Sequence, residues 1–133
     1  MTNLEFVRDA YEAMARMDID WMYSHTSPEV RFRQGGRFPT AGVYEGRDAM
    51  FGHLMDFMTM VGGQFSIEAR DFLASEERVA AVITVTTGVG DEQLHFDEIH
   101  LWKVTDGVLV EMDAIPFDPY AVDEFFARVL PAH

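Results

Sequence analysis

Cysteine is absent from the sequence, and long apolar runs are absent as well. Without cysteine the chain has no disulfide framework, no thiolate nucleophile and no zinc site built on sulfur. No apolar run approaches the ~20 residues that a membrane-spanning helix requires. The amphipathic start of the chain carries acids at Glu5, Asp9 and Glu12, unlike a secretory signal, so we expect a cytoplasmic protein.

Basic residues are also scarce. There are 10 lysines and arginines against 23 aspartates and glutamates, which gives a formal net charge of -13. Such a charge repels nucleic-acid phosphates and anionic membrane surfaces. We therefore expect no nucleic-acid partner and no membrane partner.

What the chain does have is the composition of a folded domain. It has 133 residues, of which 48% are hydrophobic and 13% aromatic. That length and composition suffice for one buried core and leave little room for a second. We expect a single domain over residues 1–133.

Helical signals occur at both ends of the chain and near its middle. Thr2 and Glu5 have the spacing of a capping box, and Asp18 is placed to end one helix and cap the next. Asp118 followed by Pro119 is typical of a helix start. The predicted helices run from Thr2 to Met17, from Ile19 to His25, from Arg47 to Met60 and from Tyr120 to Leu130.

Alternation of apolar and polar residues marks the strands. We predict strands over residues 30–34, 65–73, 79–87, 94–104 and 108–116. The glycine-rich segment Gly35–Gly46 is predicted to be a loop with at most a short strand near Val43 and Tyr44. Helices, a run of strands and a closing helix indicate an α+β fold, in which helices pack on one face of a bent antiparallel sheet.

Three segments carry a family resemblance: the first helix ending at Asp18, Ala41–Ala49 (AGVYEGRDA), and His100–Gly107 (HLWKVTDG) leading to Phe117-Asp118. Together they resemble the SnoaL-like branch of the nuclear-transport-factor-2-like superfamily. The resemblance implies a cone-shaped, barrel-like curved sheet with three N-terminal helices and a short C-terminal helix enclosing an apolar pocket. Members include polyketide cyclases, ketosteroid isomerases, epoxide hydrolases, dehydratases and non-catalytic binding modules, so the fold does not fix the reaction.

Ionisable residues lie on one face of the strand 94–104. Alternation places Glu98, His100 and Trp102 on one face and Asp97 and Leu101 on the other. Periodicity does not decide which face is inside. The resemblance does, because His100 falls where a ketosteroid isomerase places the protonated aspartate of its oxyanion hole.

His100 and Glu98 are the predicted catalytic residues. A histidine can exchange a proton near neutral pH or donate a hydrogen bond to a developing enolate. Glu98 on the same face can orient the imidazole or raise its pKa. The alternative is that His100 only hydrogen-bonds within a polar patch of the core.

Further residues are predicted to contact the ligand. The alignment points Met112 and Ala114 inward on the last strand and turns Glu111 and Asp113 outward, and Met112 can equally be ordinary core. Tyr44 either donates its hydroxyl into the pocket or only covers the core. The predicted ligand-binding residues are Trp102, Met112, Ala114, Gln34, Phe32, Tyr44 and Tyr11.

Departures from the family pattern limit the mechanism. Arg33-Gln34 occupies the position of the isomerase's aspartate base, and glutamine cannot take a proton from carbon. Tyr11 falls near, but one position off, the isomerase's oxyanion tyrosine. His95 and His100 lie on opposite strand faces, so we expect no metal site, and we assign His53 to the surface.

Two function classes follow. The first is a cofactor-independent enzyme that acts by proton transfer on a hydrophobic, cyclic small molecule, as a cyclase, dehydratase or isomerase. The second is a non-catalytic small-molecule-binding or dimerisation module. The apolar outer face with Ile99, Leu101 and Ile115 also predicts a homodimer.

Overall fold

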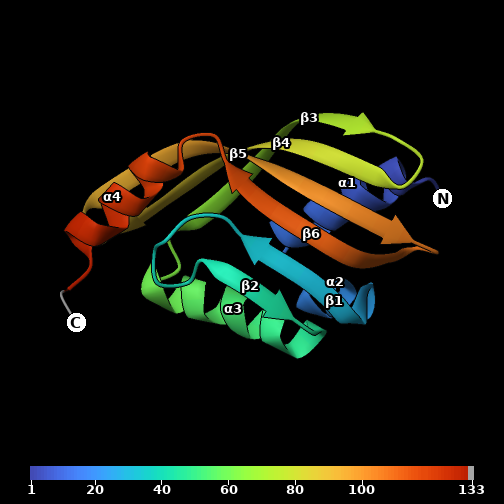
Figure 1. Cartoon of the computed structure of the whole chain (residues 1–133), viewed down its shortest axis with the longest axis horizontal. Coiled ribbons are helices and arrows are strands. Elements are labelled where there is room, and N and C mark those ends of the chain that lie inside the picture. Colours follow the sequence, from blue (N-terminus) through green and yellow to red (C-terminus); the bar gives the residue numbers. More distant parts are fainter. Residues whose placement is uncertain (132–133) are drawn as a thin grey trace.

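A computed structural model describes residues 1–131, and residues 132 and 133, the end of the predicted domain, lie outside the described part. Along the chain, two helices and two strands are followed by a third helix, four strands and a closing helix, labelled in Figure 1. The helices are α1 (Asn3–Ala15), α2 (Ile19–Ser24), α3 (Arg47–Met60) and α4 (Pro119–Val129). The strands are β1 (Thr26–Gln34), β2 (Gly42–Glu45), β3 (Phe65–Ala74), β4 (Arg78–Val89), β5 (Glu92–Thr105) and β6 (Val108–Pro116).

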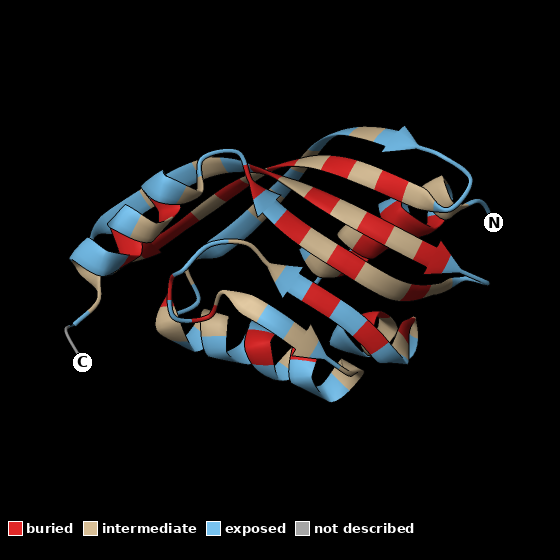
Figure 2. Ribbon diagram, viewed as in Figure 1, coloured by how far each residue is buried: buried red, intermediate tan, exposed pale blue. Residues whose placement is uncertain are grey.

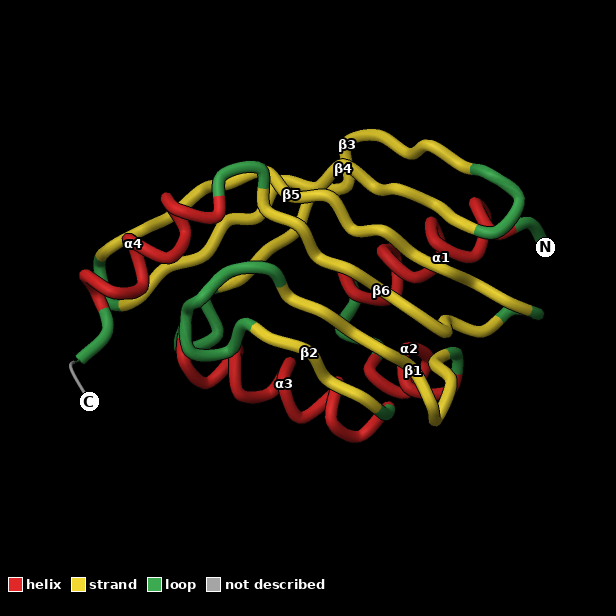
Figure 3. The backbone as a smooth tube through the Cα atoms, in the orientation of Figure 1, coloured by secondary structure: helices red, strands yellow, loops and turns green. Residues whose placement is uncertain are grey.

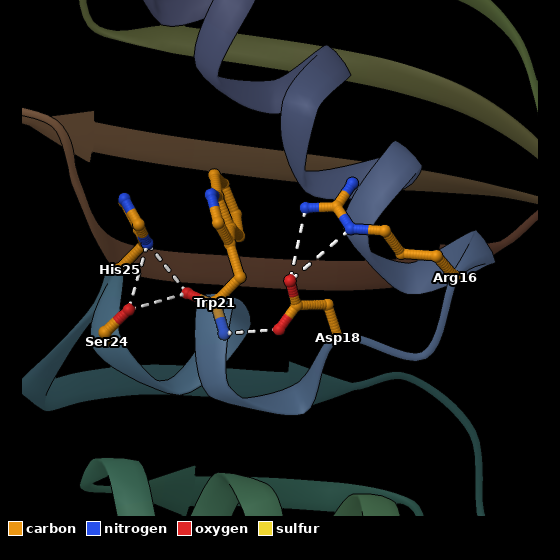
Figure 4. Close-up of polar contacts among 5 residues, drawn as sticks. All are labelled: Arg16, Asp18, Trp21, Ser24 and His25. Atoms are coloured by element: carbon orange, nitrogen blue, oxygen red, sulfur yellow. Dashed lines mark hydrogen bonds and ion pairs between the residues drawn. The ribbon is translucent and has the colours of Figure 1, made fainter.

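The predicted helix starts are confirmed by their caps. The Thr2 side chain accepts from the Glu5 backbone N–H, and the Glu5 carboxylate accepts from the Thr2 backbone, which completes a capping box. Asp18 caps α2 by accepting from the Trp21 backbone N–H at 3.0 Å, and its other oxygen pairs with Arg16, as Figure 4 shows. These contacts fix the α1–α2 corner at one edge of the cavity described below.

The six strands form one curved, unclosed sheet in the order β2-β1-β6-β5-β4-β3. Strands β3 to β6 pair antiparallel with their sequence neighbours, as predicted. The predicted α+β class is confirmed. One pairing differs from the predicted antiparallel pattern, because β1 runs parallel to β6. Alternation within a strand shows its faces but not its partner, so the sequence did not reveal this pair.

Helices cover the sheet unevenly. In Figures 1 and 3, α1 lies behind β4 to β6, while α3 lies along β1 and β2 and α4 lies beside the far ends of β4 and β5. Among the strands, backbone contacts place α1 closest to β3 and β4, and α3 closest to β1 and β2. The space between the concave sheet face, α1 and α3 is where a site can form.

Burial alternates along the long strands, as the red bands on β4, β5 and β6 in Figure 2 show. The buried side chains face α1 and α3 and form the core. Its largest cluster joins residues of α1, β1, β5 and β6, including Val7, Val30, Trp102, Leu109 and Met112. None of the helices within residues 1–131 is long and apolar enough to cross a membrane.

Candidate active site

A cavity of about 450 Å³ lies on the concave side of the sheet, which is the size range of small-molecule sites. Its wall is mostly apolar, with phenylalanines and methionines from the helices and from the strands. Among the described residues that line it, none is a lysine or an arginine. The wall therefore suits an uncharged, apolar molecule better than an anion.

The strand register brings polar side chains together over a small residue. Ala114 on β6 pairs with His100 on β5 and with Gln34 on β1. Because the alanine is short, the longer side chains on either side can meet above it. The amide Nε2 of Gln34 accordingly reaches across β6 and donates to Glu98 Oε1 at 3.1 Å.

Five side chains continue this contact into one hydrogen-bonded chain. Glu98 Oε2 lies 2.8 Å from His100 Nε2, and both side chains are buried. His100 Nδ1 lies 2.8 Å from the hydroxyl of Tyr11 on α1, and the Trp102 indole N–H donates to the same hydroxyl at 3.0 Å. The order is therefore Gln34, Glu98, His100, Tyr11, Trp102.

The donor inventory assigns a direction to the chain. Indole nitrogen only donates and a carboxylate only accepts. The Tyr11 oxygen, which accepts from Trp102, is left with its own proton to donate to His100 Nδ1. In that arrangement His100 Nε2 carries a proton and donates it to Glu98, so both imidazole nitrogens have a partner.

Tyr11 keeps its proton firmly. Burial raises the pKa of the Tyr11 hydroxyl well above its ordinary value, the hydrogen bond from Trp102 lowers it, and the nearby Glu98 charge raises it again. Burial is the largest of these causes. Tyr11 is consequently a hydrogen-bond donor at neutral pH and not a phenolate.

All but two of the predicted site residues line the cavity. Those that do are Tyr11, Phe32, Gln34, Glu98, His100, Met112 and Ala114. Trp102, predicted to contact the ligand, does not line it: Trp102 is 1% exposed in the core and reaches the site only through its bond to Tyr11. Tyr44 does not line it either, because its hydroxyl donates to the Thr40 carbonyl at 2.9 Å.

His53 is the residue that the sequence interpretation misplaced. The prediction of a surface position is wrong, because His53 is 4% exposed and lines the cavity. Its ring lies 4.9 Å from that of Phe32 and 4.5 Å from that of Tyr44. A signal was present: His53 follows Met50 by three residues and precedes Phe57 by four, which is the spacing of one helix face.

Burial also changes the chemistry of His53. Burial lowers the pKa of His53, and the smaller effects of a hydrogen bond to the Thr40 backbone and of the Asp56 carboxylate raise it. Its Nδ1 is buried and has no hydrogen-bond partner among residues 1–131. The cavity therefore holds a second histidine that is neutral at physiological pH and incompletely paired.

The outer face of the sheet holds the remaining polar candidates. Asp113, predicted to point outward, pairs with Arg33 at 2.9 Å. His95 contacts Thr86 on the same outer face. Within residues 1–131 no three histidine, aspartate or glutamate side chains cluster as metal ligands would.

Comparisons with known proteins agree on the fold. The family model of the SnoaL-like domain matches residues 7–112. The uncharacterized protein Rv0034 of Mycobacterium tuberculosis is 26% identical over 126 residues, which cover 94% of this chain and 96% of that protein.

Solved structures agree as well. Bal32a, from a soil-derived mobile gene cassette, superposes with a TM-score of 0.87 at 26% identity, covering 93% of this chain and 95% of that one. TerC, co-crystallised with polyporic acid, has a TM-score of 0.82 at 23% identity, covering 94% of this chain and 98% of that one.

Proposed function

The chain belongs to the SnoaL-like domain family, and from that premise we propose that it is a cofactor-independent enzyme acting by proton transfer on a hydrophobic, cyclic small molecule. The reaction class is that of a cyclase, a dehydratase or an isomerase. The observation that carries the proposal is the hydrogen-bonded chain from Gln34 to Trp102 within an otherwise apolar cavity. Buried polar networks of this kind are concentrated at functional sites.

The chain of side chains supplies a route for a proton. An enol hydroxyl placed against the Tyr11 oxygen gives its proton to that oxygen, while the Tyr11 proton passes to His100 Nδ1. The His100 Nε2 proton passes to Glu98, whose proton then goes to the enol carbon and completes the ketone. In reverse, from the other imidazole tautomer, Glu98 removes a proton from carbon and Tyr11 delivers one to the carbonyl oxygen.

Each predicted residue that lines the cavity has a role in this scheme. Glu98 is the group that meets carbon, Tyr11 meets the ligand oxygen, and His100 connects them. Gln34 holds the second Glu98 oxygen and so orients the carboxylate. Phe32, Met112 and Ala114 form the apolar surface against which the ring lies. The ligand is uncharged in this proposal, since Glu98 would repel an anion and no lysine or arginine among the described lining residues offsets it.

Hydrogen exchange tests the proposal without knowledge of the natural substrate. The probe is 2-tetralone, an uncharged cyclic ketone, in deuterated buffer, with α-deuteration followed by NMR. We expect wild-type protein to accelerate exchange, and Glu98→Gln and His100→Ala each to reduce the acceleration at least about 100-fold. His95→Ala, a histidine on the outer face, is the control and should keep the wild-type rate. Equal rates for wild type and both site variants would overturn the assignment.

A second function is favoured by one feature of the same site. Both His100 nitrogens are already bound within the protein, as in a site that holds a ligand without turning it over. A non-catalytic binding module predicts that 2-tetralone binds but does not exchange. Calorimetry together with the exchange rate separates the two functions.

We also propose that the protein forms a homodimer through the outer face of the sheet. Val82, Ile99 and Ile115 lie in one register row across β4, β5 and β6, and Ile115 is 41% exposed. Such a row is costly to leave in water. Sedimentation at micromolar concentration should give a dimer, and Ile115→Lys should shift it to monomer, whereas a wild-type monomer would contradict the proposal.

A further inference from the structure

His53 is a buried titratable group that the proposed proton route does not use. It lies on α3, on the wall of the same cavity, and only 4% of it is exposed. Its Nδ1 has no hydrogen-bond partner among residues 1–131. A buried polar atom without a hydrogen bond destabilises the fold, so it normally has a further partner or a function.

A second unpaired atom lies in the same neighbourhood. The hydroxyl oxygen of Thr40 is buried and likewise has no partner among residues 1–131. The Thr40 carbonyl accepts from Tyr44, whose ring lies 4.5 Å from that of His53. Of these two incompletely paired groups, His53 lines the cavity and Thr40 lies behind its wall.

The distance between His53 and Gln34, the first residue of the hydrogen-bonded chain, sets the length of ligand that can contact both. The His53 ring packs on Phe32, and Phe32 is two residues before Gln34 on β1, with both side chains on the cavity face. Two residues along a strand span roughly 7 Å. A fused two-ring molecule can cover that span.

We propose that His53 is a second polar subsite of the cavity, which hydrogen-bonds an oxygen at the end of the ligand remote from Tyr11 and Glu98. The ligand class is then an uncharged, flat ring compound that carries oxygen functions at both ends. This inference rests on the proposed function only in that the cavity takes an apolar ligand. A neutral imidazole offers one donor and one acceptor, so a hydroxyl or a carbonyl oxygen is a suitable partner.

Neutrality of the imidazole agrees with its surroundings. Burial lowers the pKa of His53, although the Thr40 carbonyl and the Asp56 carboxylate oppose that effect. Phe32 and Tyr44 pack against its ring. An imidazole held in this way presents hydrogen-bonding groups without a charge that would have to be desolvated.

Paired probes test the subsite. The probes are 2-naphthol and 2,6-dihydroxynaphthalene, which share a ring system and differ by one hydroxyl at the far end. Dissociation constants are measured by calorimetry for wild type, His53→Phe and Met50→Leu. Met50 is the matched control, because it lies one turn before His53 on the same face of α3 and also lines the cavity.

We expect wild type to bind the dihydroxy probe about fivefold more tightly than 2-naphthol, the worth of one net hydrogen bond. His53→Phe should abolish that preference and leave 2-naphthol within about twofold of wild type, while Met50→Leu should keep it. If His53→Phe does not fold, His53→Gln, which retains a polar group, should fold and keep a preference.

Contrary outcomes are distinct. Equal binding of the two probes to wild type, or an unchanged preference in His53→Phe, overturns the subsite and leaves the proposed function standing; a water held between His53 and Thr40 would give this result. Failure of both probes to bind wild type overturns the subsite and removes its premise of an apolar ligand.

Discussion

The two polar regions of the cavity differ in how completely they are paired. On the sheet side, the side chains from Gln34 to Trp102 form a continuous chain with distances of 2.8 to 3.1 Å. On the α3 side, His53 lines the cavity and its Nδ1 has no partner among residues 1–131. One region is complete without a ligand, and the other is not.

This difference separates two tasks that a ligand site has to perform. A fully paired network holds each side chain in one orientation, which proton transfer requires. Unpaired groups weaken the fold but leave hydrogen-bonding capacity for a ligand. The sheet side therefore suits chemistry, and the α3 side suits recognition. Three changes to the protein test this contrast.

Breaking the paired region should have the largest effect. His100→Leu leaves the buried Glu98 carboxylate with Gln34 as its remaining polar partner among the side chains of the chain described above. A buried charged acceptor that loses its hydrogen-bond donor costs about 3 kcal/mol, so we expect a loss of that size in the free energy of unfolding. Urea titration measures it.

The matched control for that change removes both partners. Glu98→Leu together with His100→Leu leaves no buried charge, and replacing a buried pair by apolar residues is often close to neutral. The double variant should therefore be more stable than His100→Leu alone. A double variant no more stable than the single one would show that the two residues are not coupled as their 2.8 Å contact implies.

The raised pKa of Tyr11 predicts a smaller effect that appears at high pH. The unfolded chain releases this proton near the ordinary value of 10.0, whereas the folded protein retains it because of burial. The contribution is therefore complete below pH 10 and is lost as the pH rises further, with a slope of up to about 1.4 kcal/mol per pH unit. Urea titrations at pH 9, 10 and 11 measure the loss.

Tyr11→Phe isolates this contribution. It should flatten the decline in stability above pH 10 relative to wild type. Tyr120→Phe removes a hydroxyl from a ring that is 83% exposed and serves as the control. An equal decline in wild type and Tyr11→Phe would mean that Tyr11 ionises in the folded state near its ordinary pKa, contrary to its burial.

The contrast between the two regions also explains what the sequence could predict. Period-two alternation put Glu98 and His100 on one face, because a strand has only two faces and the resemblance chose between them. The caps at Thr2, Asp18 and Asp118 fixed helix starts through local contacts. Such features depend on residues a few positions apart.

Features that depend on distant residues were missed. Tyr11 and His100 are 89 positions apart, and their contact follows from how α1 packs on the sheet. On α3, apolar residues occur almost all round the helix, so the spacing of His53 with Met50 and Phe57 did not stand out and His53 was assigned to the surface. The parallel pairing of β1 with β6 was equally invisible, because no local signal records a strand's partner.

The smallest expected effect concerns the unpaired region and appears at acidic pH. Because burial lowers the pKa of His53 below its ordinary 6.5, the unfolded chain takes up a proton before the folded protein does. The contribution of His53 to stability is therefore present above pH 6.5 and is lost as the pH falls, by less than about 1.4 kcal/mol per pH unit. Urea titrations of wild type and His53→Phe at pH 7.5, 6.5 and 5.5 measure this loss, and the variant should lose less stability.

The naphthalene probe extends this test to the ligand. If 2,6-dihydroxynaphthalene occupies the subsite, a saturating concentration of the probe should steepen the wild-type loss of stability at low pH, because a proton on His53 removes the nitrogen that accepts from the ligand. A decline that probe leaves unchanged would mean that the unpaired imidazole does not meet the ligand, and the contrast between a region for chemistry and a region for recognition would fail.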